Sequence, residues 1–340
     1  MSPSGLRVAR SRGEEARRAL LETGSLDTSL EIARGEGVLI LPLVEGAPVP
    51  RDLGEVVSRP FVPVRRPGPA DYRELVKLPD ELRAFLPRSF DVVGDIVLVR
   101  VPKPLEEHRF EIGTALLAFV PGARLVGADR GVHGVERRRT VERIAGTGPW
   151  RTRHRENGLE FDVDVERAYF SPRLAREHER VASEVQPGDR VYDLCSGIGP
   201  FALTIARDGR ARSVTAVDAN PEAIALLRAT LARYPFARRV EAVEARLEEF
   251  LPTAEPRERV VLNLPREGIK YIASVARAVA PGGRLYYYEV TDRERREESR
   301  KAMMDALGSE DRFAVVEEHV VHAYSPTSDL RAYVLERGGR

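Results

Sequence analysis

Three acidic residues close three successive strand-like segments in the second half of the chain, and together they could hold a cationic ligand. Asp193 ends the first segment, Asp218 the second and Glu244 the third. The carboxyl ends of parallel strands border the ligand crevice of an open α/β sheet, so these side chains are expected around one site. Each acid alone is more often a helix N-cap or a solvated loop residue, and their joint placement is what favours a shared ligand.

The glycine-rich turn after Asp193 indicates which ligand this is. Its glycines let the backbone approach a ligand closely, but the third glycine of a G-x-G-x-x-G dinucleotide turn is missing. Asp193 would repel a pyrophosphate, whereas it suits the ammonium group of an amino-acid-bearing cofactor. With Asp218 placed for a ribose and Glu244 for an adenine amino group, the pattern favours S-adenosylmethionine (AdoMet), whose sulfonium is cationic. The binding residues expected here are Asp193, Ser196, Gly197, Gly199, Asp218, Ala219, Glu244 and Ala245.

The fourth strand-like segment ends in Asn263-Leu264-Pro265. An amide at this point can face the edge of a nucleobase, and a proline makes the turn rigid. N-P-P-type motifs hold the target nitrogen at this position in class I methyltransferases, and we expect Asn263 and Pro265 to contact the cofactor too. Alone, this tripeptide is weak evidence for a methyltransferase site. It becomes stronger evidence because it follows the strand ends that carry Asp193 and Asp218. Three tyrosines, 286–288, are interpreted as ordinary strand formers.

Strand-like and helical runs alternate regularly from about residue 159 onward. Strands are expected at 190–194, 213–218, 240–245, 260–264 and 284–290. Between them we expect a helix that begins at 201, a helix at 221–234, a short helix near 247, a helix that ends at 280, and after the fifth strand a helix at 293–307. This alternation predicts an α/β fold, a Rossmann-like, doubly wound and mostly parallel sheet of the class I methyltransferase type. Two final strands, 313–323 and 330–336, are expected to form an antiparallel edge hairpin.

The first half of the chain divides into two smaller parts. Residues 1–58 contain a helical pattern at 14–22 and a strand pattern at 37–44, which predict a small N-terminal α/β domain. Residues 59–69 are rich in proline, which disfavours regular helices and central strands, and this stretch is therefore predicted to be a linker. Residues 70–158 mix a helix-like run at 74–85, a strand at 96–101, a helix at 110–119 and a strand near 125, and predict an α+β module. The methyltransferase domain is expected at 159–340.

Composition excludes several classes of protein. The chain has 340 residues, of which 42% are hydrophobic and 31% charged, as in globular proteins. No apolar run approaches the ~18 residues of a membrane span, and the N-terminus lacks the apolar core of a signal peptide. A single cysteine, Cys195, excludes an internal disulfide framework and a multi-cysteine metal site. No metal is expected, and a reducing cytoplasm is the expected compartment.

The net charge of +1 hides a local concentration of arginine. Only four of the 54 basic residues are lysine, and arginine suits bidentate phosphate contacts, although a GC-rich genome would produce the same bias. Residues 131–155 hold seven arginines against two acids. These arginines are Arg137, Arg138, Arg139, Arg143, Arg151, Arg153 and Arg155. Such an excess predicts a surface for nucleic acid.

Several segments together give the chain a family resemblance over almost its whole length. They are residues 88–96, 142–146, 156–158, Tyr169-Phe170-Ser171-Pro172-Arg173, the turn 193–201, Asn263-Leu264-Pro265 and Tyr287-Tyr288-Glu289. The sequence resembles the archaeal/eukaryotic-type tRNA (guanine-37-N1)-methyltransferase family. That resemblance implies methyl transfer from AdoMet to N1 of guanosine 37, next to the anticodon. It also implies that the N-terminal domain contacts the tRNA elbow, that the middle module grips the anticodon stem-loop, and that the protein is a monomer.

The resemblance assigns the general base to Glu177, four positions after the arginine of Ser171-Pro172-Arg173. From the residues alone, Glu177 is expected in the first turn of a helix, where the helix dipole favours an ionised carboxylate. An ionised carboxylate is what a proton acceptor requires. Glu179 fits the description of an ordinary helical acid.

Further roles follow from the same resemblance. A fixed cation would stabilise negative charge on guanine O6, and Arg137 is the best positional match, with a slip to Arg138 or Arg139 left open. These three arginines, Arg173 and Pro265 are expected at the substrate, and Asn263 at the guanine edge. The chain departs from the family in having Glu244 instead of the usual aspartate, His178 instead of a frequent arginine, and Cys195-Ser196 in the turn. His178 is still expected near the cofactor.

Other functions remain as alternatives. A wyosine-pathway transferase would move the aminocarboxypropyl group of AdoMet to the same tRNA position, but that family lacks the N-x-P motif. Methylation of a tricyclic wyosine intermediate stays open. A catalytically silent tRNA-binding protein is disfavoured by the intact Glu177, Asn263 and Asp193. A nicotinamide oxidoreductase is disfavoured by the missing third glycine.

Overall fold

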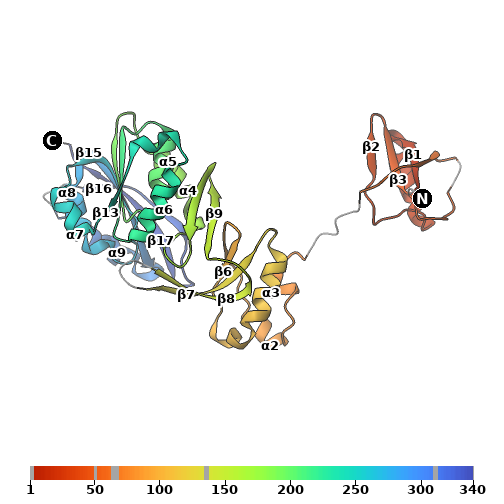
Figure 1. Ribbon diagram of the computed structural model, residues 1–340, viewed down its shortest axis with the longest axis horizontal. Coiled ribbons are helices and arrows are strands. Elements are labelled where there is room, and N and C mark those ends of the chain that lie inside the picture. The colour runs from red at the N-terminus through yellow and green to blue at the C-terminus, as the bar shows by residue number, and fades with distance from the viewer. Residues whose placement is uncertain (1–3, 50–51, 63–68, 134–137, 309–312, 340) are drawn as a thin grey trace. The chain divides into compact units, whose positions relative to one another are not determined.

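The computed structural model describes residues 4–49, 52–62, 69–133, 138–308 and 313–339, and the chain forms two compact units, 1–70 and 71–340. Figure 1 labels the elements of both. The first unit is a four-stranded antiparallel sheet in the order β2-β3-β1-β4, covered by helix α1. Its elements are β1 (Ser4–Ala9), α1 (Gly13–Glu22), β2 (Ala33–Gly35), β3 (Val38–Pro42) and β4 (Glu55–Ser58). The sequence pattern found α1 and β3 but missed the other three strands.

The second unit begins with a four-stranded sheet in the order β5-β6-β7-β8, packed on α3. These elements are β5 (Asp91–Val93), β6 (Ile96–Val99), α3 (Arg109–Phe119), β7 (Leu125–His133) and β8 (Arg138–Gly146). The helix expected at 74–85 is wrong. Its place is taken by two short turns of helix, Tyr72–Glu74 and α2 (Asp80–Arg83), because Pro79 cannot continue a helix from the preceding turn.

A hairpin of β9 (Arg151–Glu156) and β10 (Leu159–Asp164) follows. The domain boundary expected at 158/159 coincides with the turn of this hairpin, where Asn157 and Gly158 both have positive φ. The hairpin contacts the preceding sheet, since the Gly94 N–H donates to His154 Nδ1 at 3.2 Å and Thr152 Oγ1 donates to Asp95 at 2.7 Å. Residues from both sides of this junction share one apolar core.

The rest of the chain is a seven-stranded sheet in the order β13-β12-β11-β14-β15-β17-β16, parallel from β13 to β15 and antiparallel at β17 and β16. This confirms the doubly wound α/β class and the antiparallel edge hairpin. Its strands are β11 (Arg190–Leu194), β12 (Ser213–Asp218), β13 (Val240–Glu244), β14 (Arg257–Leu262), β15 (Val279–Asp292), β16 (Phe313–Ala323) and β17 (Ser328–Arg337). Strand β14 ends at Leu262, two residues earlier than expected, and residues 279–280 belong to β15 instead of a helix.

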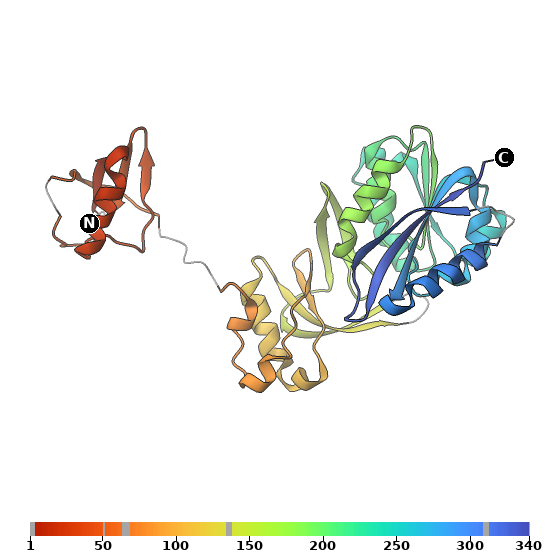
Figure 2. The same ribbon diagram turned by 180° about the vertical axis from the view of Figure 1, so that it is seen from behind.

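Helices cover both faces of this sheet, as Figures 1 and 2 show from opposite sides. One face packs on α4 (Ala175–Glu184), α5 (Pro200–Asp208) and α6 (Pro221–Leu231), and the other on α7 (Leu247–Phe250), α8 (Ile272–Arg277) and α9 (Arg296–Leu307). Two separate apolar clusters fill these layers. Among the described residues no helix is long and apolar enough to cross a membrane.

Register across the sheet brings distant residues into one row. Leu262 of β14 lies beside Tyr287 of β15, so Asn263 follows at the level of Tyr288. Tyr288 pairs with Ala332 of β17, and Ala332 pairs with His319 of β16. Asn263, Tyr288 and His319 therefore share one level of the sheet, although they are separated by up to 56 positions along the chain.

Candidate active site

A pocket lies at the carboxyl edge of the parallel strands, between the Cys195–Pro200 turn and the segment that leads into α4. Its lining residues are Tyr169, Phe170, Ser171, Leu174, His178, Cys195, Ser196, Gly197, Pro200, Asp218, Ala219, Asn220, Ala223, Asn263 and Leu264. Three different strands contribute, because parallel strands with crossover helices present all their carboxyl ends at the same edge. Six of the residues expected at the cofactor are among them: His178, Ser196, Gly197, Asp218, Ala219 and Asn263.

Four buried side-chain atoms at this edge have no hydrogen-bond partner within the described protein. They are His178 Nε2, Asp193 Oδ1, Ser196 Oγ and Asn263 Oδ1. A buried polar atom that is left unpaired costs ~1–3 kcal/mol, and such atoms are rare in folded proteins unless a ligand or water completes them. Three of these atoms belong to residues that line the pocket, and Asp193 lies on β11, two residues before the lining residue Cys195. This grouping indicates a ligand that offers both donors and acceptors, as the amino-acid part and ribose of AdoMet do.

Asp193 is fully buried on β11, and its Oδ2 accepts a hydrogen bond from the Ala202 N–H at 3.0 Å. Burial raises the pKa of this carboxyl to about 7, helped by the negative charge of Asp218 and opposed by the Ala202 donor. An ammonium group placed beside Oδ1 would offset the burial and hold Asp193 ionised. The residue thus fits the cationic end of an amino-acid-bearing cofactor.

The backbone of the turn is left-handed at three residues, Cys195, Gly197 and Gly199. Cys195 has φ of 59°, a left-handed conformation that is uncommon for a residue with a side chain, and Gly197 has φ of 54°. The Gly197 N–H donates to Asp218 Oδ2 at 2.7 Å, which closes the turn over the end of β12. Gly199 has a packing requirement, because a Cβ there would lie 2.5 Å from Leu227 Cδ1 of α6, and its contact with the cofactor stays a prediction.

His178 of α4 reaches the pocket from the opposite side. Its Nδ1 lies 2.5 Å from Glu156 Oε1 of β9, and both side chains are almost completely buried. A carboxylate at Nδ1 favours the tautomer that carries its proton there, so Glu156 orients the ring and leaves Nε2 facing the pocket. The sequence did not assign Glu156 a role, since only the pairing of β9 with β10 and the packing of α4 bring it to His178.

Glu177 precedes His178 on α4 but lies in a different environment. It is 5% exposed and does not line the pocket. Its carboxylate accepts hydrogen bonds from Tyr288 Oη at 2.8 Å, from His319 Nε2 at 3.1 Å and from the Arg180 guanidinium at 2.5–3.1 Å. Burial alone would raise the pKa of Glu177, but Arg180, Tyr288 and His319 together hold that pKa below its usual value.

The helix dipole that sequence reasoning invoked for Glu177 is thus not its main support. Two of the residues that hold the carboxylate, Tyr288 and His319, come from the row of the sheet that also contains Asn263. Both were missed, and Tyr288 had been interpreted as a strand former alone. Their separations from Glu177 are 111 and 142 residues, so no local pattern could reveal the contacts. Arg180, one turn after Glu177 on the same helix, was the detectable signal.

Several expected residues lie outside the pocket lining. Glu244 is exposed, although its backbone pairs with Asp218, and the Ala245 N–H donates to the Asp218 carbonyl at 3.1 Å. The Pro265 carbonyl accepts a hydrogen bond from the Val290 N–H at 2.9 Å, which fixes the turn after Asn263 to the neighbouring strand. Pro265 therefore shapes the wall that carries Asn263.

The candidate substrate arginines are only partly described. Arg137 and the side chain of Arg138 lie outside the described residues. Arg139 is 7% exposed, and its guanidinium donates to the Phe170 carbonyl at 3.4 Å and lies 5.5 Å from the centre of the Tyr169 ring. Arg139 thus reaches residues that line the pocket. Arg173 instead pairs with Asp91 of β5 at 2.6 Å, which ties the segment before α4 to the middle sheet.

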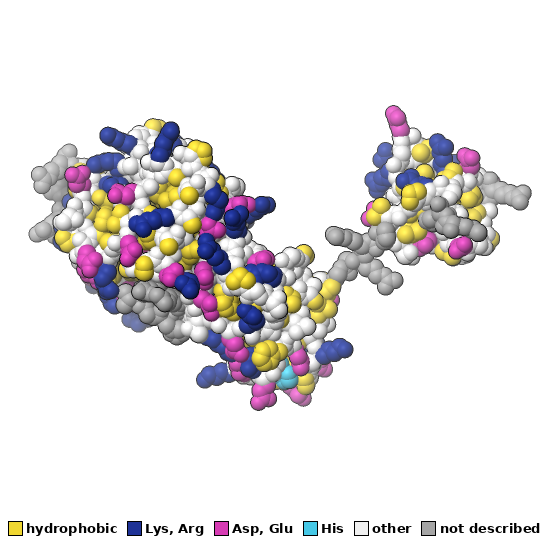
Figure 3. All heavy atoms as spheres, viewed as in Figure 1, with side chains coloured by type: hydrophobic (Ala, Val, Ile, Leu, Met, Phe, Trp, Pro, Cys, Tyr) yellow, Lys and Arg dark blue, Asp and Glu magenta, His cyan; other side chains and the backbone are white. Residues whose placement is uncertain are grey.

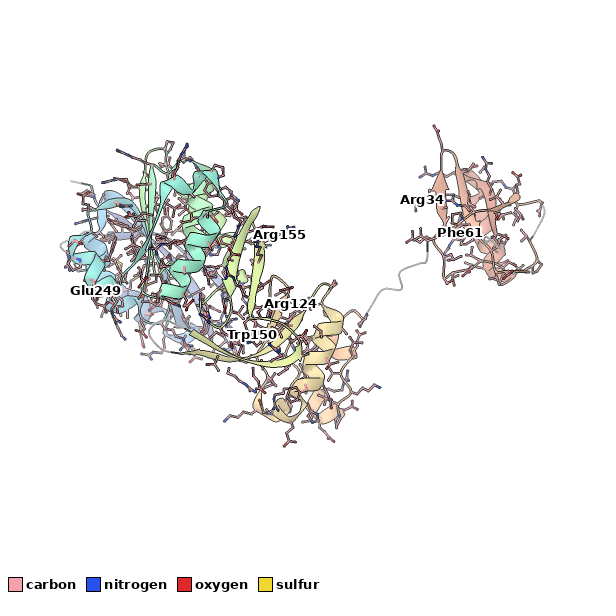
Figure 4. All side chains as sticks on the ribbon, in the orientation of Figure 1. Arg34, Phe61, Arg124, Trp150, Arg155 and Glu249 are labelled. Atoms are coloured by element: carbon pink, nitrogen blue, oxygen red, sulfur yellow. The ribbon has the colours of Figure 1, made fainter. Side chains whose placement is uncertain are left out.

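Three other arginines of segment 131–155 alternate along β9, whereas Arg143 lies on β8. Arg151, Arg153 and Arg155 are exposed, whereas Thr152 and His154 between them are partly buried. Figure 4 labels Arg155 on this strand, with Trp150 and Arg124 near its beginning. Arg124 donates to the Thr147 and Pro149 carbonyls and so fixes the segment that leads into β9. Figure 3 shows basic and acidic side chains interspersed over this face of the unit.

A crevice of this kind, on a sheet whose strands run 3-2-1-4-5-7-6 when counted from β11, defines a class I AdoMet-dependent methyltransferase. Family comparisons cover the chain in three parts. The tRNA methyltransferase 5 N-terminal domain matches residues 5–50, the TYW2 N-terminal domain 72–149 and the TRM5/TYW2 methyltransferase domain 152–316.

Relatives agree with these matches. The tRNA (guanine(37)-N(1))-methyltransferase Trm5b of Pyrococcus abyssi is 34% identical over 287 residues, 83% of each chain. The crystal structure of that protein covers 99% of both chains with a TM-score of 0.72, and a complex of aTrm5 with tRNALeu gives 0.75 at 27% identity, covering 99% of this chain and all of that one. A tRNA 4-demethylwyosine(37)-methyltransferase, Taw21 of Saccharolobus solfataricus, is 26% identical over 72% of this chain and 94% of its own. The chain belongs to the Trm5 family of tRNA methyltransferases.

Proposed function

We propose that the protein transfers the methyl group of AdoMet to N1 of guanosine 37 of tRNA, with Glu177 as general base. The observation that carries the proposal is the pairing of two features at one edge of the sheet. Three residues that line the pocket, His178, Ser196 and Asn263, carry unpaired buried polar atoms, and Asp193 carries a fourth on β11. The buried carboxylate of Glu177 belongs to the residue before His178 and contacts Tyr288, which lies at the level of Asn263.

The cofactor assignment follows from the chemistry of the unpaired atoms. Asp193 Oδ1 would accept a hydrogen bond from the ammonium group of the cofactor, and Asp218 would contact its ribose. His178 Nε2 and Ser196 Oγ would form hydrogen bonds with the other polar groups of the cofactor. The amide of Asn263 would lie between the cofactor and the incoming base. AdoMet supplies the methyl group.

Glu177 performs the proton transfer in this proposal. N1 of a neutral guanine carries a proton, so a carboxylate must remove it as the bond to carbon forms. Negative charge then grows on O6, and a guanidinium from Arg137, Arg138 or Arg139 would stabilise it. The described contacts of Arg139 with Tyr169 and Phe170 support this part of β8 as the source of the cation.

Binding of tRNA would engage more of the chain. The exposed arginines of β9 would contact phosphates of the anticodon stem-loop, and guanosine 37 would leave its stack to enter the pocket. We assign the N-terminal unit to the tRNA elbow, the active form to a monomer, and the compartment to the cytoplasm, where the single Cys195 would stay reduced.

Nucleoside mass spectrometry tests the proposal. Transcripts with guanosine or adenosine at position 37 are treated with enzyme and AdoMet and then digested. We expect 1-methylguanosine from the first transcript alone, and equal methylation of both would contradict a guanine-specific mechanism.

The wyosine-pathway alternative predicts a different product. Transfer of the aminocarboxypropyl group would give a much larger mass increase than a methyl group. The demethylwyosine methyltransferase relative makes a second substrate worth testing, and tRNA that carries the tricyclic base serves that purpose in the same assay.

A further inference from the structure

The amino-acid end of the proposed cofactor carries two opposite charges, and so far only one of them has a partner. Asp193 Oδ1 suits the ammonium group, but the carboxylate requires a cationic or strong hydrogen-bond donor. None of the described residues that line the pocket is a lysine or an arginine, and His178 is the basic side chain among them. Arg139 donates to a backbone carbonyl, and Arg173 pairs with Asp91. His178 is therefore the candidate partner of the carboxylate.

The buried neighbour of His178 indicates that the ring is charged. Glu156 Oε1 lies 2.5 Å from His178 Nδ1, and the two side chains are 2% and 1% exposed. An ionised carboxylate at this depth is strongly disfavoured unless a cation lies beside it. An imidazolium at His178 supplies that cation, whereas a neutral ring would leave the negative charge of Glu156 uncompensated.

His154 is the other ionisable group close to Glu156, and it does not supply the charge. Its Nε2 lies 4.0 Å from Glu156 Oε2, which has no hydrogen-bond partner within the described protein. Its Nδ1 accepts a hydrogen bond from the Gly94 N–H at 3.2 Å, so that nitrogen carries no proton. Burial lowers the pKa of His154 despite the nearby charge of Glu156. The ring of His154 is therefore neutral, and Glu156 depends on His178.

We propose that Glu156 and His178 form a buried ion pair whose remaining N–H, at His178 Nε2, binds the carboxylate of the cofactor's amino-acid end. The proposal rests on the proposed function. His178 Nε2 has no hydrogen-bond partner within the described protein, and its side chain lines the pocket. Both nitrogens of an imidazolium donate hydrogen bonds, so this atom presents a cationic donor to the ligand. Glu156 is a positioning residue, because it acts on the cofactor only through His178.

A pair of ligands isolates the carboxylate contact. AdoMet and decarboxylated AdoMet share the sulfonium, the amine and the nucleoside, and differ in the carboxylate alone. In calorimetry we expect the parent protein to bind AdoMet about tenfold to hundredfold more tightly, as for one charge-assisted hydrogen bond. Equal affinities for the two ligands would overturn the proposal and leave the proposed function standing. Failure to bind either ligand would overturn both the ion pair's role and the cofactor assignment on which it rests.

Two variants assign this preference to the ion pair. His178→Gln keeps an N–H donor without charge, and Glu156→Gln removes the charge that stabilises the imidazolium. Both should lose most of the preference for AdoMet but bind decarboxylated AdoMet nearly as the parent does, which also shows that they are folded. His178→Arg, which introduces a permanent cation, should keep the preference. Glu160→Gln, on the same hairpin and paired with the exposed Arg155, is the matched control. Full preference in Glu156→Gln would overturn the role of Glu156.

Nuclear magnetic resonance measures the protonation of the ring directly. Nitrogen-15 spectra of the six histidines, with His178 assigned by its absence in His178→Gln, show which ring nitrogens carry a proton. We expect protons on both nitrogens of His178 in the AdoMet complex at neutral pH, and on one nitrogen in Glu156→Gln. An unprotonated Nε2 in the parent complex would overturn the proposal, because a bare nitrogen cannot donate to a carboxylate.

Discussion

Two adjacent residues of α4 lie in opposite surroundings. His178 faces a pocket in which its own Nε2, Ser196 Oγ and Asn263 Oδ1 have no hydrogen-bond partner among the described residues. Glu177 faces the antiparallel side of the sheet, where Tyr288, His319 and Arg180 all donate to its carboxylate. The pocket side of the site thus contains unpaired polar atoms, whereas the Glu177 carboxylate already has three hydrogen-bond donors.

The pocket beside His178 and the surroundings of Glu177 therefore have different roles. Unpaired atoms in the pocket make ligand binding favourable, because the ligand removes a cost that the free protein carries. The complete shell around Glu177 instead fixes an ionised carboxylate in place before any substrate arrives, which is the preorganisation that proton transfer requires. Variants that affect only one of these two regions therefore provide the sharpest tests.

Glu177→Gln should have the largest effect, and it should be confined to chemistry. An amide cannot accept the N1 proton, so single-turnover methylation should fall about 10²- to 10⁴-fold, while AdoMet affinity measured by calorimetry stays close to that of the parent. Glu179→Gln, two positions later and paired with Arg207 at the surface, is the matched control. A similar loss in both variants would remove the special role of Glu177.

Asp193→Asn should instead weaken cofactor binding at the pocket. Loss of a charge-assisted hydrogen bond costs ~1.5–3 kcal/mol, so AdoMet affinity should fall about tenfold to hundredfold. Asp305→Asn, on an exposed face of α9, should leave the affinity unchanged. Unaltered binding by Asp193→Asn would show that the ammonium group lies elsewhere.

The same residue should make the ligand-free protein sensitive to pH. The pKa of Asp193 is about 7 in the fold against 3.8 for an ordinary aspartate, so the unfolded chain ionises first, and the contribution of Asp193 to stability falls as pH rises from about 4 to 7. Relative to the parent, Asp193→Asn should gain roughly 2 kcal/mol of unfolding free energy between pH 5 and pH 8. Urea titrations at both pH values measure this, and a constant difference would contradict the burial of an unpaired carboxylate.

Gly199→Ala should weaken the fold without a specific effect on the ligand. The added Cβ would meet Leu227 at 2.5 Å at a φ of +77°, and we expect a loss of about 2 kcal/mol. Gly188→Ala, with φ of +91° and open space around its Cβ, should lose about 1 kcal/mol from backbone strain alone. If AdoMet affinity fell more than stability in Gly199→Ala, the glycine would belong to the pocket instead.

Arg155→Ala should have the smallest effect, a modest loss of tRNA binding, and should change neither the cofactor pocket nor the surroundings of Glu177. This side chain is 83% exposed and pairs with Glu160 at 2.7 Å. We expect a modest loss of tRNA affinity, with the salt dependence of binding reduced by about one phosphate contact. An unchanged salt slope would place the anticodon stem-loop away from β9.

The sequence predicted those strands whose formation depends on interactions between residues near one another in the chain. Strands 190–194, 213–218 and 313–323 match β11, β12 and β16 at both ends, because apolar runs bounded by turn residues specify buried strands. The run at 74–85 failed because its apolar spacing imitates a helix that Pro79 interrupts. Glu156, Tyr288 and His319 could not be assigned, since their contacts depend on strand register and on helix packing over long sequence separations.

A structure of the protein with tRNA and a non-reactive AdoMet analogue tests the central claim most directly. The account predicts guanine N1 within hydrogen-bond distance of a Glu177 carboxylate oxygen, with the analogue's amine near Asp193 and the Asn263 amide at the edge of the base. A Glu177 still enclosed by Arg180, Tyr288 and His319, with N1 facing another side chain, would contradict it.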